Sequence, residues 1–371
     1  MTIIFDGEAI RASTLEVRKD NWSDTRVVTD ESGVQLGENE VLLQIDRLAL
    51  TANNISYASA GDTLGYWRFF PAADGWGRVP AMGWADVVAS NHPEVSVGER
   101  VWGFFPFSTH LKILAGRVSQ QSFSDVSSHR EGLAPVYAQF DRASAYLIYE
   151  QAREDQDSLL RGLYMTSWLV EDFLQMNDFF AATSCLITSA SSKTSISLGH
   201  CVKLRGSLNS IALTSAGNVA FCESLGCYDR VITYEQVHSL DAAESVVVVD
   251  MAGSASILSD VHHHYADNLK HSCRIGATHI ESAGSVGELP GPTPEFFFAP
   301  GHLQVRSKEL GAAEFMMRLG TAYVGFRQFC DGWLRVESSV GAEAVAAVYQ
   351  RVLAGKSDPA SGQIISLRVQ P

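Results

Sequence analysis

The stretch from residue 183 to residue 234 constrains the fold of this chain more than any other. Residues 183–189 form a short apolar run with β-branched side chains, which predicts a buried strand. A polar turn and a helix over residues 195–205 follow, and residues 210–214 predict a second strand. This βαβ unit is about 30 residues long, the length of a dinucleotide-binding unit whose pyrophosphate rests on the amides at the helix start.

The turn inside this unit departs from the usual chemistry. A dinucleotide fold normally has glycine at three places, and here Ser189, Ser192 and Ser195 stand at that spacing. A serine hydroxyl can donate to a phosphate oxygen, and Lys193 adds a positive charge beside them. An ordinary α/β turn with a serine helix cap explains the same residues. A P-loop is a weaker third interpretation, because Lys193 and Thr194 lack both glycines of that motif.

Length and charge limit the class of protein. The 371 residues favour two domains, and a composition of 46% hydrophobic and 19% charged residues is that of a folded soluble protein. A formal net charge of −14 argues against nucleic acid or an anionic membrane as a partner. It leaves room for one local basic pocket that binds a phosphate.

The cysteines and the first residues indicate the compartment. The six cysteines form no C-x-x-C pair and several lie in apolar patterns, so we expect free buried thiols in a reducing environment. The first eight residues are too acidic for a signal peptide. No run approaches the roughly 18 apolar residues that cross a bilayer. We therefore expect a cytoplasmic protein.

The residue pattern changes along the chain from strand-type to helix-type spacing, which predicts two kinds of domain. Short β signals recur up to residue 114, which predicts a β-barrel-like first domain. The aromatic segment 66–76 is either a hydrophobic plug or one wall of a ligand pocket. Helical spacing takes over at 143–149 and 158–176, and the unalternating valines of 245–250 are typical of a buried parallel strand. Residues 312–330 and 341–353 predict helices, and residues 362–367 a last strand.

Several motifs carry a family resemblance. Residues 97–103 (V-G-E-R-V-W-G) and 224–234 (S-L-G-C-Y-D-R-V-I-T-Y) resemble motifs of the medium-chain dehydrogenase/reductase superfamily, in particular its zinc-free quinone and enoyl reductase branch. Residues 40–45, 50–55 and the ending 355–365 are similar to further parts of that branch. More closely, residues 189–194, 214–219 and 250–253 resemble the DUF2855 family, which brings no established reaction.

The resemblance implies a fold of two domains with the active site in the cleft between them. Residues 1–150 and 306–371 would form a GroES-like β-barrel domain, and residues 151–305 a Rossmann-type domain with a doubly wound parallel sheet. No zinc is expected, because Asn53 and Asn54 stand near the position of the zinc-binding cysteine and Gly83-Trp-Ala replaces the family's G-H-E. His262, His263 and His264 cannot converge on one ion as consecutive helix residues, so we expect a solvated helix with chance histidines.

NADPH is the cofactor that these residues favour. An NAD site usually has an acidic residue at the end of the second strand, whereas here Thr214, Ser215 and Asn218 follow that strand. These three residues could equally cap the next helix. The complete set of expected cofactor-binding residues is Ser189, Ser191, Ser192, Lys193, Thr194, Thr214, Ser215, Asn218, Tyr234, Ala252 and Gly253.

A proton donor is less evident. The resemblance places Tyr66 where enoyl reductases of this branch carry a tyrosine donor, with Tyr57 as a second choice and Asn54 as a further catalytic candidate. Either tyrosine could also be a structural aromatic.

The resemblance and the turn therefore leave two function classes. One is an NADPH-dependent reductase of an enone, enoyl thioester or quinone, and the other is a non-redox enzyme or binding protein on the same fold.

The expected partners follow from these two classes. The aromatic segment favours a small apolar or aromatic substrate. A second copy of the chain, in a homodimer, is an open alternative, and neither nucleic acid nor a membrane is expected.

Overall fold

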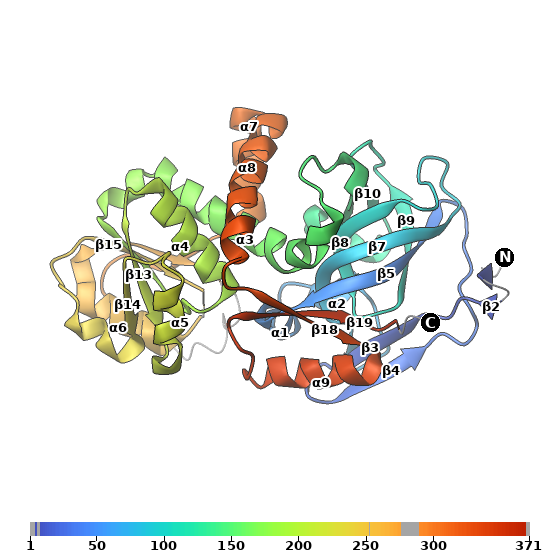
Figure 1. Cartoon of the computed structure of the whole chain (residues 1–371), viewed down its shortest axis with the longest axis horizontal. Coiled ribbons are helices and arrows are strands. Elements are labelled where there is room, and N and C mark those ends of the chain that lie inside the picture. The colour runs from blue at the N-terminus through green and yellow to red at the C-terminus, as the bar shows by residue number, and fades with distance from the viewer. Residues whose placement is uncertain (1–3, 6–7, 252, 276–288, 369–371) are drawn as a thin grey trace. The chain divides into compact units, whose positions relative to one another are not determined.

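The computed structural model describes residues 4–5, 8–251, 253–275 and 289–368 of the chain (Figure 1). It divides into two compact units. The first comprises Met1–Leu159 and Arg335–Pro371, and the second comprises Leu160–Leu334.

A closed barrel of six strands forms the centre of the first unit. In sheet order these are β5 (Glu40–Leu50), β7 (Pro80–Ser90), β8 (Arg100–Pro106), β11 (Gln139–Arg142), β10 (Ser122–Asp125) and β9 (His110–Gly116). The barrel closes because β5 pairs antiparallel with β7 on one side and with β9 on the other. Closure leaves these strands without a free edge.

The first unit contains further strands and helices besides those of the barrel. The strands are β1 (Ile4–Phe5), β2 (Glu8–Ala9), β3 (Ser13–Arg18), β4 (Thr25–Thr29), β6 (Trp76–Gly77), β18 (Arg335–Val340) and β19 (Ser361–Ser366), and the helices are α1 (Ala52–Ser59), α2 (Tyr66–Phe69) and α9 (Ala342–Leu353). β19 pairs with β5, and β18 pairs with β19. The end of the chain therefore belongs to the barrel sheet.

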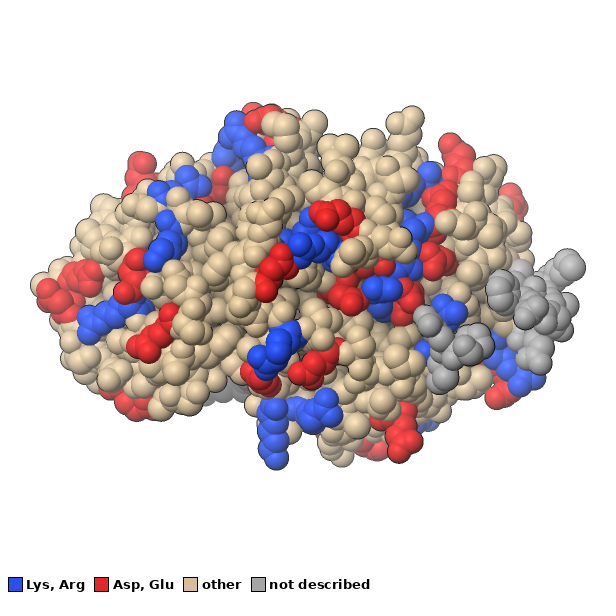
Figure 2. All heavy atoms as spheres, in the orientation of Figure 1, with Lys and Arg blue, Asp and Glu red and all other residues tan. Residues whose placement is uncertain are grey.

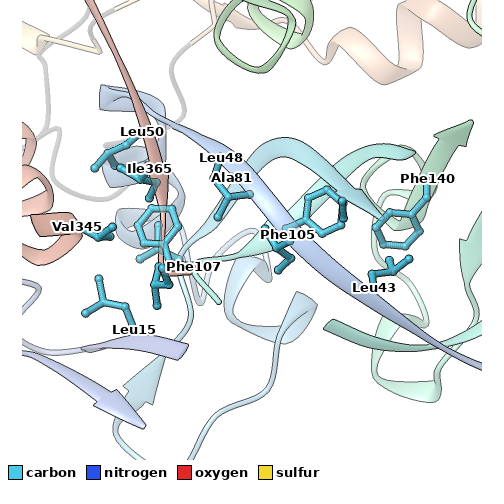
Figure 3. Close-up of a cluster of buried hydrophobic side chains, with 14 of the residues drawn as sticks. Leu15, Leu43, Leu48, Leu50, Ala81, Phe105, Phe107, Phe140, Val345 and Ile365 are labelled. Atoms are coloured by element: carbon cyan, nitrogen blue, oxygen red, sulfur yellow. The ribbon is translucent and has the colours of Figure 1, made fainter. Parts of the chain in front are cut away.

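The core of this unit joins its two sequence segments. Val345, Val348, Tyr349 and Val352 of α9 are buried at helical spacing and belong to the same apolar cluster as the barrel residues. Figure 3 shows Val345 of α9 and Ile365 of β19 near Leu50 and Phe107. Burial of each such side chain is worth about 1.5–3 kcal/mol, which holds the last segment to the barrel.

The second unit contains a parallel sheet of six strands. Their sheet order is β14 (Arg230–Thr233), β13 (Asn209–Thr214), β12 (Ser184–Ile187), β15 (Val246–Asp250), β16 (Leu269–Arg274) and β17 (Glu295–Phe296). Numbered along the chain, this order is 3-2-1-4-5-6, which is that of a doubly wound dinucleotide-binding sheet. The sequence prediction of a GroES-like barrel together with a Rossmann-type sheet is confirmed.

Helices surround this sheet and close the unit. They are α3 (Glu154–Met176), whose residues from Leu160 onward belong to the second unit, α4 (Lys193–Arg205), α5 (Val219–Ser224), α6 (Ala255–Tyr265), α7 (Ala299–Leu310) and α8 (Ala312–Cys330). Among the described helices, none combines the length and the apolar character that a membrane crossing requires. Figure 2 shows acidic and basic side chains interspersed on the face that it presents.

The second boundary between the units lies after Leu334 rather than after residue 305. The reason is the packing of α7 and α8 on α3. Tyr164 of α3 stacks on Phe326 of α8 with ring centroids 4.8 Å apart, and Arg306 of α7 donates to Asp172 of α3 at 2.8 Å. Residues 306–334 are therefore part of the second unit, and the first boundary lies after Leu159 rather than after residue 150.

Local predictions differ from the structure mainly where helices are short. The predicted helix over 143–149 is only a 3-10 turn at Ala143–Ala145, and α3 begins later, at Glu154. Within the region where short β signals recur, residues 40–50 form one long strand, β5. The prediction of free buried thiols is confirmed, because all six cysteines are buried and none forms a disulfide.

The packing of α4 on its sheet depends on Gly199. A Cβ at this position would lie 2.9 Å from Cδ1 of Tyr228 and closer still to another atom of that ring. Tyr228 itself is buried, and its hydroxyl donates to the Ala190 carbonyl at 2.8 Å. A larger residue would therefore push the helix away from the turn that precedes it.

We expect Gly199→Ala to destabilise the second unit by about 1–3 kcal/mol, because the neighbouring ring is fixed by its hydrogen bond. Gly325→Ala is the matched control, since it lies in α8 with open space around its Cβ position. That change should be neutral or stabilising by about 0.5–1 kcal/mol. Thermal unfolding of both variants measures the difference, and equal effects would contradict the packing role of Gly199.

Candidate functional site

The strand order of the parallel sheet reverses between β12 and β15. In open α/β sheets, ligands bind beyond the carboxyl ends of the strands at such a point. Thr188 follows β12 and Asp250 ends β15, so their side chains meet at this edge. The Thr188 hydroxyl donates to Oδ1 of Asp250 at 2.7 Å, and this bond links the two strand ends.

Asp250 organises the backbone around this edge. The residue is 1% exposed, and the amide of Gly253 donates to its Oδ2 at 3.1 Å. The hydroxyl of Thr188 in turn accepts from the Met251 amide at 2.9 Å. A buried carboxylate is tolerated only when donors surround it, so these bonds fix the segments after both strands.

Ser189 begins the turn in a left-handed conformation. Its φ is +48°, a value that normally favours glycine. Three bonds hold the turn in place: the Ser189 amide donates to the Tyr234 hydroxyl at 3.1 Å, the Ala190 amide to the Leu213 carbonyl at 3.0 Å, and Tyr228 to the Ala190 carbonyl. Serine here adopts the backbone shape that a first glycine would provide.

Ser192 and Ser195 direct their hydroxyls into the protein. Ser192 is the N-cap of α4, and its hydroxyl accepts from the Ser195 amide at 3.1 Å and donates to the Ser195 hydroxyl at 2.8 Å. Ser195 is fully buried and donates to the Thr188 carbonyl at 2.8 Å. Neither hydroxyl therefore stands between the helix start and a ligand in front of it.

The end of β13 joins the same turn. The Asn218 side-chain amide donates to the hydroxyls of Ser191 at 3.0 Å and Ser215 at 3.2 Å. These three predicted residues therefore lie together, and none of them is acidic. Thr214 is buried and lies against Cys222, so its side chain faces the interior.

Lys193 and Thr194 form the first turn of α4. The positive end of the helix dipole and the Lys193 ammonium group favour an anion at this end. Burial raises the pKa of the Cys330 thiol, and the Lys193 charge opposes that rise, so the ammonium group lies near the end of α8. Thr194 is largely buried, and its carbonyl accepts from Ser167 at 2.7 Å.

Two further residues that the sequence predicts to bind the cofactor, Ala252 and Gly253, follow β15 in the chain. Gly253 has a φ of +68° and binds Asp250 through its amide. Ala252 lies outside the described residues.

The predicted catalytic tyrosines lie in the first unit. The ring centroids of Tyr57 of α1 and Tyr66 of α2 are 4.6 Å apart, and Phe104 and Tyr137 complete the cluster. Burial raises the pKa of the Tyr57 and Tyr66 hydroxyls, and the Tyr137 hydroxyl nearby raises both further. Tyr66 and Tyr137 also share a hydrogen bond. Both predicted phenols therefore stay protonated at neutral pH.

Asn54 serves a structural purpose in the same unit. Its Oδ1 accepts from the Thr51 amide at 2.6 Å, and its Nδ2 donates to the Pro80 carbonyl at 2.7 Å. The residue is buried and closes the capping box at the start of α1. Its polar atoms hold α1 against β7, which leaves the tyrosines as the better candidates for chemistry.

The aromatic segment 66–76 is partly plug and partly wall. Trp67 is buried and fills the space beside Gly61 and Gly77, where a Cβ would overlap its ring. Phe69 and Phe70 instead line a cavity of the first unit. Part of the segment is therefore a hydrophobic plug, and part of it lines a cavity.

The three histidines of α6 do not converge. His262 is fully buried and bonds the Pro290 carbonyl and the Ser272 hydroxyl, both at 2.9 Å. His263 contacts Ser259, and His264 the Leu240 carbonyl. The expectation of a solvated helix is wrong for His262. Within the described part of the chain, no group of three or more His, Cys, Asp or Glu side chains is placed to hold a metal ion.

Sequence reasoning missed Thr188, Asp250 and Tyr228 as parts of the site. A charged residue that ends an all-valine strand is an available signal for Asp250. A threonine directly after the partner strand gives the corresponding signal for Thr188. The contact of Tyr228 with the turn depends on tertiary packing and leaves no local signal.

A GroES-like barrel unit followed by a Rossmann-type unit is the architecture of medium-chain dehydrogenases and reductases. Residues 48–358 match the family model described as protein of unknown function, DUF2855, so the chain belongs to this family. No curated protein matches the sequence significantly.

Solved structures share the fold at low identity. A mutant enoyl thioester reductase from Candida tropicalis is 14% identical, with a TM-score of 0.57 over 96% of this chain and 100% of its own. CurA from Vibrio vulnificus in complex with NADPH is 14% identical, with a TM-score of 0.58 over 98% of this chain and 100% of its own. The complex of Etr1p with NADP and crotonyl-CoA is 13% identical, with a TM-score of 0.56 over 96% of this chain and 100% of its own.

The hydrogen bond between Thr188 and Asp250 is testable on its own. Thr188→Val keeps the shape but removes the hydroxyl from a buried carboxylate, so we expect a loss of about 1.5–3 kcal/mol of unfolding free energy. Thr183→Val, at the exposed start of the same strand segment, is the matched control and should cost less than about 0.5 kcal/mol. Urea unfolding measures both. Similar losses in the two variants would contradict the role assigned to the Thr188 bond.

Proposed function

We propose that the protein is an NADPH-dependent reductase of an activated double bond or carbonyl in a small apolar or aromatic substrate. An enone, an enoyl thioester or a quinone has the required chemistry. The second unit binds the nucleotide, and the first unit supplies the residues that face the substrate. Zinc has no part in this reaction.

The strand order of the second unit carries this proposal. An order of 3-2-1-4-5-6 places the carboxyl ends of β12 and β15 side by side, and the start of α4 follows β12 directly. This is the arrangement that receives a dinucleotide pyrophosphate. Solved structures that share the fold include CurA with NADPH and Etr1p with NADP, which supports the choice of cofactor.

The serine turn fits the phosphates of a dinucleotide despite the missing glycines. Ser189 holds the positive φ of the turn, and Ser192 and Ser195 fold their hydroxyls back toward the protein. A pyrophosphate can therefore come close to the backbone amides at the start of α4. Lys193, at the first position of α4, would hold a phosphate oxygen by a charge-assisted bond.

The end of β13 favours NADPH over NADH. Ser215 and Asn218 are polar but uncharged, and they lie beside Ser191. An acidic residue here would bind the ribose hydroxyl of NAD and repel a 2′-phosphate. The hydroxyls of Ser191 and Ser215 accept from the Asn218 amide and can donate their own protons to that phosphate instead.

The tyrosine cluster supplies the proton. When bound, NADPH supplies the hydride for the electrophilic carbon of the substrate. Tyr66 holds a proton at its hydroxyl, because burial keeps the pKa of that group above its usual value. It is the group that we assign to protonate the other atom of the reduced bond, with Tyr137 as its hydrogen-bond partner. The phenylalanine and tyrosine rings around it suit a flat apolar substrate.

Tyr66→Phe should lower kcat by about 10²-fold or more, because general acid catalysis contributes at least that much. Tyr57→Phe is the matched control from the same cluster and should retain most activity. Oxidation of NADPH with an enone, an enoyl thioester and a quinone measures both variants. Full activity in Tyr66→Phe would exclude it as the proton donor.

Lys193→Ala should weaken NADPH binding by roughly ten- to a hundredfold, the equivalent of about 1.5–3 kcal/mol for one charge-assisted bond. If Lys193 reaches the 2′-phosphate, the affinity for NADH should hardly change. If it reaches the pyrophosphate, the affinities for NADPH and NADH should fall by similar factors. Lys203→Ala, near the other end of α4, is the control and should leave binding unchanged. Unaltered NADPH binding in Lys193→Ala would contradict the assigned position of the phosphates.

The inward hydroxyls of Ser192 and Ser195 also favour the second function class. Both are already hydrogen-bonded within the protein, so they offer no donor to a phosphate. If the protein is instead a non-redox enzyme or a binding protein on this fold, the wild-type chain should bind neither NADPH nor NADH.

A further inference from the structure

The strand β18 forms one edge of the sheet that contains the barrel. It stands at the end of the sheet order, and β19 is its only strand partner among the described residues. The two strands run parallel, from Arg335 opposite Ser361 to Val340 opposite Ser366, and Figure 1 shows them side by side. An edge strand presents unpaired backbone groups, which are a template for pairing with another strand.

The register with β19 decides which backbone groups of β18 are unpaired. The Arg335 amide donates to the Ala360 carbonyl at 2.9 Å, and the Gly341 amide donates to the Ser366 carbonyl at 2.8 Å. In a parallel ladder, every second residue turns its amide and carbonyl toward the same neighbouring strand. The residues between them turn both groups to the other side, where no backbone partner stands within the described ranges: Val336, Ser338 and Val340.

β18 lacks most of the features that keep an edge strand from pairing. Proline, lysine, a bulge or a covering element serve that purpose in natural sheets. Residues 335–340 contain neither proline nor lysine, and their register with β19 has no shift. Val336 is 37% exposed and Val340 is 52% exposed. The edge is therefore open to a further strand, which would also cover these two apolar side chains.

The two charged residues of β18 are engaged with their own unit. Arg335 forms an ion pair with Asp358, and the Gln363 side chain donates to Oε2 of Glu337 at 2.8 Å. Because side chains alternate along a strand, both charged residues lie on the face opposite to that of the two valines. The valine face of the edge is therefore uncharged.

The sequence of β18 matches an antiparallel copy of itself. With a two-fold axis at Ser338, Val336 of each chain lies opposite Val340 of the other. These are the residues whose backbone groups turn outward, so each of the three pairs can exchange two hydrogen bonds. The valines form two cross-strand pairs on one face, a favourable combination in antiparallel sheets.

Charge also selects this register over its neighbours. Glu337 lies opposite Ser339 of the second copy, and Arg335 lies opposite Gly341, so no like charges face each other. Outward backbone groups meet only when one strand slides by two residues at a time. A slide in one direction sets Glu337 opposite Glu337, and a slide in either direction separates the paired valines.

We propose that β18 pairs antiparallel with β18 of a second copy of the chain, about a two-fold axis at Ser338, so that the two barrel sheets continue into one another. One strand from each copy gives an interface at the small end of the known range, so the dimer forms reversibly. The inference is independent of the proposed reductase function, because no residue of β18 belongs to the serine turn or to the tyrosine cluster.

Cysteine cross-linking tests the register. Residues of a hydrogen-bonded antiparallel pair have Cα atoms about 5.5 Å apart, a distance that a disulfide spans. Mild oxidation of the full-length Ser338→Cys variant should therefore give a disulfide-linked dimer, without background from the six native cysteines, which are buried. Glu337→Cys is the matched control on the same strand. Its two copies lie diagonally, about 7–8 Å apart, and should cross-link at least about tenfold more slowly. Equal cross-linking of the two variants would overturn the register.

Sedimentation equilibrium tests the dimer itself. The full wild-type chain should show a monomer–dimer equilibrium with a Kd between about 10 µM and 1 mM. Ser338→Pro removes an outward amide without breaking a bond to β19, and it should weaken the dimer at least about tenfold. Val340→Lys should do the same, because it sets a charge opposite Val336.

Val97→Lys is the matched control for the added charge, since Val97 is an exposed valine outside β18, and it should leave the equilibrium unchanged. A wild-type chain that stays monomeric up to about 1 mM would overturn the proposal. So would a dimer that survives in Val340→Lys, even if Ser338→Pro failed to fold.

Discussion

The hydrogen bond between Thr188 and Asp250 is the constraint on which the proposed nucleotide site depends. It joins the ends of β12 and β15, the two strands between which the sheet order reverses. Because Asp250 is buried, its carboxyl group needs the hydroxyl of Thr188 and the amide of Gly253. These bonds fix where the chain leaves both strands, and the turn that leads into α4 starts from that fixed point.

The serine turn shows how glycine can be replaced without loss of shape. Ser189 tolerates a positive φ because its amide, its neighbour Ala190 and the overlying Tyr228 are all hydrogen-bonded. Ser192 serves as the helix cap, and the close contact between helix and sheet moves one turn along the helix to Gly199. The usual roles of three glycines are thus shared among a strained serine, a capping serine and one glycine further on.

Much of the fold follows from local sequence patterns. The change from strand to helical spacing locates β12, α4 and β13 to within two residues, and the helix predicted over 312–330 is α8. Barrel closure between β5 and β9 does not follow, since residues about 70 positions apart must pair. The boundary at residue 305 misses α7 and α8 because their packing on α3 is a tertiary effect.

The candidate site was predictable only in part. The segment of the serine turn follows from its position after a buried strand, but the inward direction of Ser192 and Ser195 does not. Asn54 illustrates the same limit, because its structural bonds to Thr51 and Pro80 are invisible in a motif.

Nucleotide binding by the unmodified protein tests the central claim most directly. Calorimetric titration of the full chain with NADPH and, separately, with NADH compares the two cofactors under one condition. The uncharged end of β13 predicts saturable NADPH binding that is at least about tenfold tighter than NADH binding, a difference of about 1.4 kcal/mol. Protein that binds neither nucleotide at millimolar concentration would contradict the account.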